Sequence, residues 1–452
     1  TELWSALQEQ LIVPENETYN FFGIADPQAG FSYERPPHSS SYKLAYFLSQ
    51  QSHRFQTDGA DTVAAFPVVA SYRFLHDRIQ QAAYGLIPDN QKQITHLEIG
   101  RLLHKTASDT QLEIDLFDIV DHWNRGLELI HNSTEQHQLC QLNLTAGQRA
   151  KEATAYELAE QYARAGIQLL GSWKTEYDMM LALHELAAEV TYLNGEFIQA
   201  QTWANRLIQG SRDFLDQIKV YEIQILIKIA QKQLLAAIEL GRQVLLELDI
   251  NIPAAPTAAD IQQALATMAT LVPHSKIRSL AELPTMTDSR ALAALTILNT
   301  IAATVYLAQP KLVPLLVLEQ VKLSVIYGNS PLSAGAYARY GFILCSQGND
   351  IESGYQFGRL ALSLSEKFND KAINTRVFLM VGVLTIPWKH HLRQSLPLLD
   401  SAYEDGLASG NLDGAALADY YDRQSSCLIG QELTNLEHQV AVRMPRPRQI
   451  NH

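Results

Sequence analysis

The clearest candidate for chemistry in this sequence is a histidine beside an aspartate, at a point where an extended segment is expected to enter a helix. His76 and Asp77 follow the extended run 66–74 and precede a helical pattern, with Arg78 next to them. Free backbone N–H groups at a helix N-terminus attract anions, and an imidazole there can add a hydrogen bond to a phosphate. The sequence predicts either an anion site at these residues or a plain helix start, which Asp77 caps and against which His76 packs.

One segment resembles the end of a phosphate-binding loop but lacks the glycine that such a loop needs. Residues 171–175 read GSWKT, so Trp173 stands immediately before the lysine. A glycine is required at that position because the backbone N–H groups must converge on a phosphate. No other phosphate loop, kinase glycine loop, HRD or DFG triplet, or nucleophile elbow occurs in the sequence. The chain alone is therefore expected not to be an enzyme, and no catalytic residue is predicted.

The remaining histidines and cysteines form no metal or disulfide pattern. His184-Glu185 resembles the start of a histidine-kinase phosphoacceptor box, but no glycine-rich ATP box follows, so a packing histidine is favoured. No spacing places two metal ligands on one helix face, so no metal site is predicted. Cys140, Cys345 and Cys427 are far apart in the sequence, which fits a reducing cytoplasm.

Composition restricts the classes of partner. The 452 residues include 35 Lys and Arg against 48 Asp and Glu, a net charge of −13 that argues against a nucleic-acid partner. Residues 291–308 are uncharged and long enough for a membrane span, but Asn299 and three threonines favour a buried helix and no membrane partner. The chain begins at Thr1 without a signal-peptide pattern, so we expect a cytoplasmic piece of a longer protein.

Extended segments are expected only before residue 75, and helical periodicity covers most of the chain beyond that residue. Residues 11–14 and 66–74 should be extended, and they flank a loop at 19–67 rich in Gly, Pro, Ser and aromatic residues. The order of helix, strand, long hairpin, strand and helix predicts the end of a winged helix. From about residue 90 the pattern is helix, short turn, helix.

Residues 181–207 form the clearest repeat. Asn194-Gly195 separates two helices, because glycine relieves a helix C-terminus. Small residues where the helices cross and aromatic residues in the groove are typical of tetratricopeptide (TPR) repeats. Weaker units recur at irregular spacing, and Pro-rich breaks at 251–257 and 273–288 flank a helix at 258–271.

Such helix pairs can bury their apolar faces only by stacking. The sequence therefore predicts an all-α fold, a TPR-like α-solenoid of stacked antiparallel helix pairs with a small N-terminal β-hairpin. The residues predicted to pack the repeats are Tyr156, Ala159, Tyr192, Gly195, Phe197, Ala200, Ala230, Ala237, Tyr337, Gly341 and Gly348.

Several segments of the sequence together resemble a known family. They include LWSALQE at 3–9, YRFLHDRIQQAAY at 72–84, ATAY at 153–156 and YLNG at 192–195. They are similar to multidomain signalling proteins, common in cyanobacteria, that join a Ser/Thr kinase, a STAND/AAA-type ATPase, a TPR-like region, a GAF domain and a sensor histidine kinase. The resemblance covers about residues 1–440, and FLHDRIQQAAY is its most specific part.

The resemblance implies a domain organisation and a role for the histidine. Residues 1–89 would be the C-terminal part of a winged-helix subdomain of the ATPase, residues 90–440 the helical repeats, and residues 441–452 a basic, Pro-rich tail. In related STAND proteins the histidine of a Met-His-Asp motif reaches the phosphates of ADP, which implies a similar role for His76-Asp77. ATP, ADP and Mg belong to parts of the family that this chain lacks, so no cofactor is expected in the chain itself.

The leading functional hypothesis is a non-catalytic regulatory segment. Its repeats would bind a protein partner, the longer protein's own domains or, as a second choice, a small molecule, and would thereby control the nucleotide state of an adjoining ATPase module. One alternative is a segment of a helical-repeat STAND transcription activator. Another is part of an enzyme whose ATP-binding and protein kinase activities are supplied by other regions.

Overall fold

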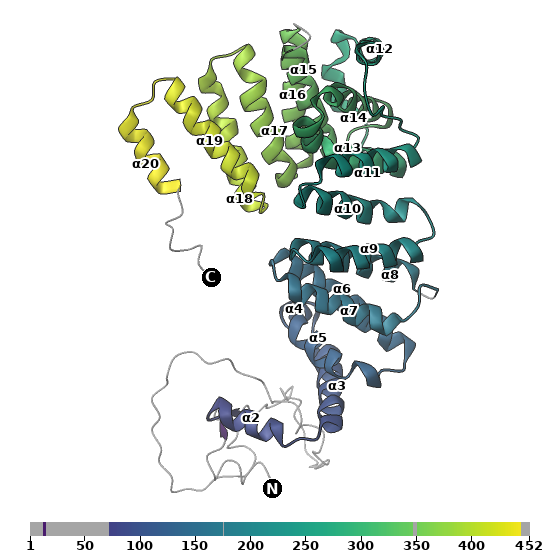
Figure 1. Ribbon diagram of the computed structural model, residues 1–452. Helices are drawn as coiled ribbons and strands as arrows, with labels where there is room; N and C mark the ends of the chain where they lie inside the picture. Colours follow the sequence, from purple (N-terminus) through teal and green to yellow (C-terminus); the bar gives the residue numbers. More distant parts are fainter. Residues whose placement is uncertain (1–11, 15–71, 175, 347–349, 444–452) are drawn as a thin grey trace, which may run out of the picture. The chain divides into compact units, whose positions relative to one another are not determined.

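The computed structural model describes residues 12–14, 72–174, 176–346 and 350–443 (Figure 1). They fall into two compact units that divide between His131 and Asn132. The predicted wing loop and the end of the predicted basic tail lie outside the described residues. The division predicted at residue 89 and the winged-helix assignment stay predictions.

In its described residues, the first unit contains a pair of short strands and four α-helices. Strand β1 (Ile12–Pro14) pairs antiparallel with β2 (Tyr72–Phe74), so that Val13 lies opposite Arg73. The helices are α2 (Asp77–Gly85), α3 (Asp89–Thr106), α4 (Asp109–Ile114) and α5 (Leu116–Arg125). Helix α3 lies close against α5 at Gly100, where an added Cβ would be 2.9 Å from the backbone nitrogen of Trp123.

The second unit consists of helix pairs, which confirms the predicted all-α, solenoid-like fold. The first helices of the pairs are α6 (Ser133–Glu152), α8 (Tyr177–Leu193), α10 (Ile218–Ala230), α13 (Ser289–Ala308), α15 (Pro331–Ser346), α17 (Lys371–Leu384) and α19 (Leu412–Leu428). The second helices are α7 (Tyr156–Leu170), α9 (Phe197–Gly210), α11 (Leu234–Glu247), α14 (Val313–Tyr327), α16 (Ile351–Phe368), α18 (Leu396–Ala408) and α20 (Leu433–Arg443). Each first helix also contacts the first helix of the next pair, and we call this series the first-helix row.

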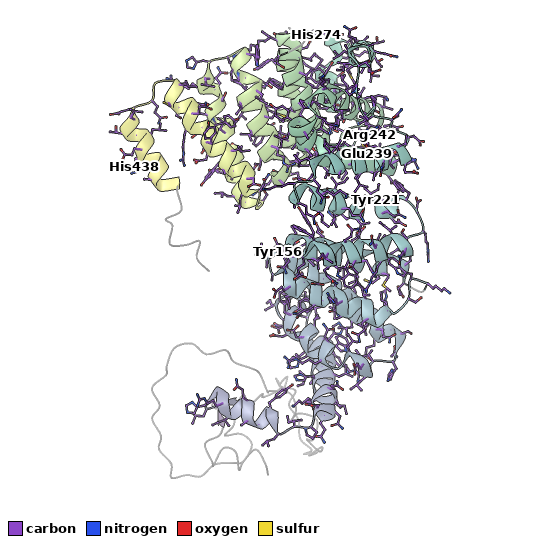
Figure 2. All side chains as sticks on the ribbon, in the orientation of Figure 1. Tyr156, Tyr221, Glu239, Arg242, His274 and His438 are labelled. Carbon is purple, nitrogen blue, oxygen red and sulfur yellow. The ribbon has the colours of Figure 1, made fainter. Side chains whose placement is uncertain are left out.

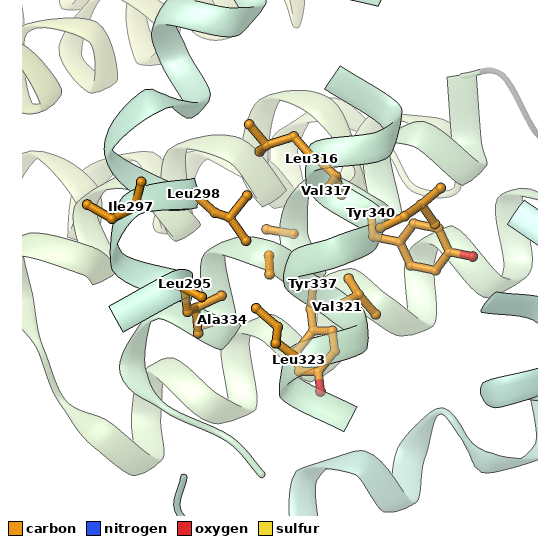
Figure 3. Close-up of a cluster of buried hydrophobic side chains, with 14 of the residues drawn as sticks. Leu295, Ile297, Leu298, Leu316, Val317, Val321, Leu323, Ala334, Tyr337 and Tyr340 are labelled. Carbon is orange, nitrogen blue, oxygen red and sulfur yellow. The ribbon is translucent and has the colours of Figure 1, made fainter. Parts of the chain in front are cut away.

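The largest part of the core lies where α13, α14 and α15 meet (Figure 3). Ile297 and Leu298 of α13 and Val317 of α14 are fully buried, as is Tyr337 of α15. Burying a large apolar side chain stabilises a fold by roughly 1.5–3 kcal/mol, so these contacts fix the order of the pairs. The hydroxyl of Tyr337 donates to Oδ1 of buried Asn329 at 3.0 Å, which satisfies its polar atom inside the core.

The Pro-rich breaks are held against the helices by specific side chains. Helix α12 (Ala258–Leu271) has the predicted bounds and starts at a capping box formed by Thr257 and Asp260. Before it lies Arg242 on α11, which is labelled in Figure 2. Its Nε donates to the carbonyl oxygen of Ile252 at 2.7 Å. After it, Nδ1 of His274 lies 2.5 Å from Oγ of Ser353 on α16.

Helix α13 is the uncharged stretch that the sequence singled out. In the described part of the chain it is the one helix long and apolar enough to cross a membrane, and half of its most apolar window is buried within the protein. It packs against α10, α11 and α14. A helix in the middle of stacked pairs needs apolar side chains on several faces, so core packing alone accounts for this composition.

The predicted packing residues occupy different environments. Four are fully buried: Ala159, Ala200, Ala237 and Tyr337. Three aromatic ones are half-buried: Tyr156, Tyr192 and Phe197. Gly195 adopts a φ of +79°, which favours glycine at this turn. Ala230 is exposed at the last position of α10, Gly341 lies where α15 meets α16, and Gly348 lies outside the described residues.

Candidate functional site

The predicted nucleotide-sensing segment lies at the start of α2. His76 occupies the N-cap position with an extended backbone (φ −139°, ψ 143°) and makes no side-chain capping bond. Asp77 is the first helical residue, and its side chain lies outside what the structure describes. His76 and Arg78 are both exposed, so His76 does not pack into a core here. Its role towards a nucleotide stays a prediction.

The phosphoacceptor-like histidine is part of the core, as expected. His184 is 3% exposed, and its ring lies 4.7 Å from that of Trp173 and 5.6 Å from that of Trp203, measured between centroids. Burial lowers the pKa of His184, and Nδ1 lies 2.8 Å from the carbonyl oxygen of Met180. A buried, neutral imidazole between two indoles is placed for packing and not for phosphate transfer.

Trp173, from the segment that resembles a phosphate loop, has a packing role too. An added Cβ on Gly210 would lie 2.1 Å from its indole, so the ring fills the space that this glycine leaves. The tryptophan that breaks the phosphate-loop pattern therefore joins α8 to the end of α9.

A continuous chain of charged side chains runs across the first-helix row. Lys151 of α6 pairs with Glu189 of α8 (Nζ–Oε2 3.0 Å), and Glu189 also pairs with Lys219 of α10 (3.2 Å). Nζ of Lys219 in turn lies 3.3 Å from Oε2 of Glu222. The other carboxylate oxygen of Glu222, Oε1, accepts a hydrogen bond from Oγ1 of Thr300 on α13 at 3.2 Å. We call these five residues the polar ladder. Four successive first helices are thereby connected through side chains alone.

The ladder is half-buried, and its electrostatics depend on its own members. Burial opposes ionisation of Glu189, but Lys219 and Lys151 outweigh it and lower the pKa of this carboxyl. Burial likewise opposes the charge of Lys219, but Glu222 and Glu189 outweigh it and raise its pKa. Glu189 and Lys219 therefore stay ionised at neutral pH.

Glu185 extends the ladder by one helical turn along α8 and behaves differently. Burial, reinforced by Glu189 and Asp216 and opposed by Lys219, raises the pKa of Glu185 to about 7. This carboxyl is therefore partly protonated at neutral pH and can donate as well as accept a hydrogen bond. The polar ladder and Glu185 together supply fixed charges and one titrating carboxyl, which are the groups needed to bind a polar protein segment. They include no nucleophile with an activating base.

The first unit has a histidine cluster of its own. Nη1 of Arg125 donates to Nε2 of His96 at 3.1 Å, so the His96 proton is on Nδ1, which donates to Nδ1 of His122 at 2.8 Å. The hydroxyl of Tyr84 lies 2.8 Å from the same Nε2. Burial, with Arg125 and His122, lowers the pKa of His96 to about 4. Across the described residues, no group of three or more His, Cys, Asp or Glu side chains could hold a metal ion.

Comparison with known proteins connects the chain with signalling. No protein-family model matches it. The chain is 25% identical over 397 residues to the hybrid signal transduction histidine kinase G of Dictyostelium discoideum. That alignment covers 77% of the chain but 11% of the much longer kinase. The chain is thus similar to one segment of a multidomain signalling protein, and this similarity assigns it no catalytic activity of its own.

The polar ladder was not predicted from the sequence. Its charged members lie on successive first helices, but Lys151, Glu189 and Lys219 are 38 and 30 residues apart. The sequence pattern that could have revealed the ladder is a charged residue recurring on each first helix. The irregular spacing of the repeats hides this pattern. The predicted His76 and the ladder belong to different compact units.

Proposed function

We propose that the chain is a non-catalytic regulatory segment of a signal-transduction protein, and that the first-helix row binds a protein segment. In this proposal, binding controls the nucleotide state of an adjoining ATPase module, or the kinase activity coupled to it. The single observation that carries the proposal is the polar ladder, supported by the similarity to a signalling histidine kinase.

The ladder suits recognition better than stabilisation. Ion pairs with partly exposed side chains contribute at most about 1 kcal/mol each to stability, because solvent screens them. Charges held in fixed positions by their neighbours instead select partners with the complementary pattern. Stacked helix pairs present such a pattern over an extended surface, which fits a partner segment lying across several helices.

Control of a distant module requires that the partner bind its two states with different affinity. The ladder connects α6, α8, α10 and α13, so a partner lying on it would contact several helix pairs at once. A change in how these pairs stack would alter the binding surface, and binding would in turn favour one arrangement.

The test reverses the ladder while keeping its internal pairs. The variant combines Lys151→Glu, Glu189→Lys, Lys219→Glu and Glu222→Lys, which leaves the net charge unchanged. The control variant combines Glu319→Lys and Lys322→Glu, which reverses one ion pair on α14, a helix outside the first-helix row. In the wild type, Nζ of Lys322 lies 3.0 Å from Oε1 of Glu319. Both variants should retain the wild-type circular dichroism spectrum.

The readout is ATP turnover by the longer protein that joins this chain to its ATPase module. We expect the reversed ladder to change the turnover and the control to leave it at the wild-type level. Wild-type turnover and signal response with the reversed ladder would refute the proposed regulatory function.

A further inference from the structure

A cavity of about 340 Å³ opens among the later members of the first-helix row. Its walls come from α13, α15, α17 and the turn between α18 and α19. The volume is at the lower end of the range for pockets that hold small organic molecules. Its lining includes the apolar side chains of Leu332, Ile373 and Val377 together with Asn299 and two arginines.

The two arginines are Arg339 and Arg376, and within the described ranges neither forms an ion pair with a carboxylate. Nε and Nη2 of Arg339 donate to Oε1 of Gln320 at 3.2 and 2.9 Å. Nη2 also donates to Oδ1 of Asn299 at 3.3 Å. Neutral amide oxygens therefore hold the partly buried guanidinium in place without cancelling its charge.

The hydrogen-bonding pattern of Arg339 leaves one part of its guanidinium available. Gln320 is fully buried and occupies the Nε and Nη2 edge. Nη1 has no partner among the residues that the structure describes, and Gly335, one turn earlier on α15, leaves space beside it. An added Cβ at Gly335 would lie 3.5 Å from both Nη1 and Nη2.

The second arginine approaches from the next first helix. Arg376 lies on α17, is exposed, and makes no hydrogen bond or ion pair with other described residues. Two unneutralised positive charges facing one cavity are unusual in a chain of net charge −13. Lys151 and Lys219, on earlier members of the same row, both pair with glutamates.

We propose that this cavity binds a small organic oxyanion, a carboxylate or a phosphate. Its charged end lies between Arg339 and Arg376, and its apolar part contacts Leu332, Ile373 and Val377. Arginine suits this role because its planar fork of N–H donors matches the oxygens of both groups. The ligand site goes beyond the proposed regulatory function and does not depend on it.

The test is calorimetric titration of the whole chain with phenyl phosphate, benzoate and benzyl alcohol, three ligands that share a ring and differ in charge. We expect at least one anion to bind and the alcohol not to bind. The anion that binds more tightly identifies the ligand class as phosphate or carboxylate. Binding of benzyl alcohol as tight as that of the tighter anion, or no binding of either anion at about 10 mM, would overturn the proposal.

A matched pair of variants locates the site. Arg376→Gln removes an exposed charge inside the cavity, and Arg359→Gln removes an exposed charge on α16 outside it. Neither arginine has a hydrogen-bonding partner in the described part of the chain, so both variants should fold. We expect Arg376→Gln to weaken anion binding at least about tenfold and Arg359→Gln to change it less than about twofold. Equal binding by the two variants would overturn the assignment.

Discussion

The close approach of α15 and α16 allows a direct test of how the helix pairs pack. An alanine at Gly341 would place its Cβ 2.7 Å from the carbonyl oxygen of Gly354 and 3.3 Å from Cβ of Phe357. Because the nearest atom belongs to the backbone, α15 and α16 would have to separate to accept this methyl group. Gly335 lies on the same helix, but its added Cβ would come no closer than 3.5 Å to the Arg339 side chain. Gly335→Ala is therefore the matched control for Gly341→Ala.

The comparison of the two variants isolates the steric cost. Each replacement gains about 1 kcal/mol from the higher helix propensity of alanine, and this gain cancels between them. Overpacking a well-packed contact costs about 1–3 kcal/mol. We therefore expect Gly341→Ala to be about 1–3 kcal/mol less stable than Gly335→Ala, and Gly335→Ala to be at least as stable as the wild type.

The assay must report on these helices, because repeat arrays can unfold in parts. Hydrogen exchange of the amides of α15 and α16 gives the local free energy of opening, and urea unfolding followed by circular dichroism gives the global one. Exchange in both helices should be faster in Gly341→Ala than in Gly335→Ala. Equal protection in the two variants would show that α15 and α16 are not in backbone contact at Gly341, and would refute this packing.

Three further predictions concern titration and capping. The pKa of His96 is lowered from its usual 6.5 to about 4, so between these pH values the unfolded state binds more protons than the folded state. The first unit should therefore lose stability to urea as the pH falls through this range, and His96→Gln should reduce the loss. The pKa of Glu185 is raised from 4.5 to about 7, so between these pH values the folded state binds more protons than the unfolded state. Stability to urea should therefore fall as the pH rises from 4.5 to about 7, and Glu185→Gln should remove this pH dependence. Thr257→Ala removes a hydrogen bond to the backbone of Asp260 and should cost about 1 kcal/mol, seen as faster amide exchange in the first turn of α12 and not in α15.

Local patterns were sufficient to predict the helix pairs. Helical periodicity, Gly195 at a turn and prolines around 258–271 all act within one or two turns of chain, and the structure has the corresponding elements. The helix expected after the extended run 66–74 begins at Asp77. Ala230, predicted to pack the repeats, is the last residue of α10 and is exposed.

The polar ladder and the arginine cavity could not be predicted in the same way. Thr300 meets Glu222 across 78 residues, and Arg339 meets Asn299 across 40. Such pairs are formed only when helices stack in one particular register, and that register depends on packing of the whole core. The irregular length of the repeats removed the one signal, a fixed period, that would have aligned these positions.

The contrast between the ladder and the cavity follows from how each buried charge is balanced. Burial opposes the charge of Lys219, but two glutamates outweigh it and raise the pKa of the lysine. Burial and neighbouring Arg376 lower the pKa of Arg339 to about 10, and no carboxylate among the described residues pairs with it to offset them. Arg339 is still charged at neutral pH, but its charge is held at a free-energy cost. An oxyanion between the two arginines would remove this cost, so anion binding should stabilise α15 and α17 specifically, and slower amide exchange in these two helices on adding phenyl phosphate would show it.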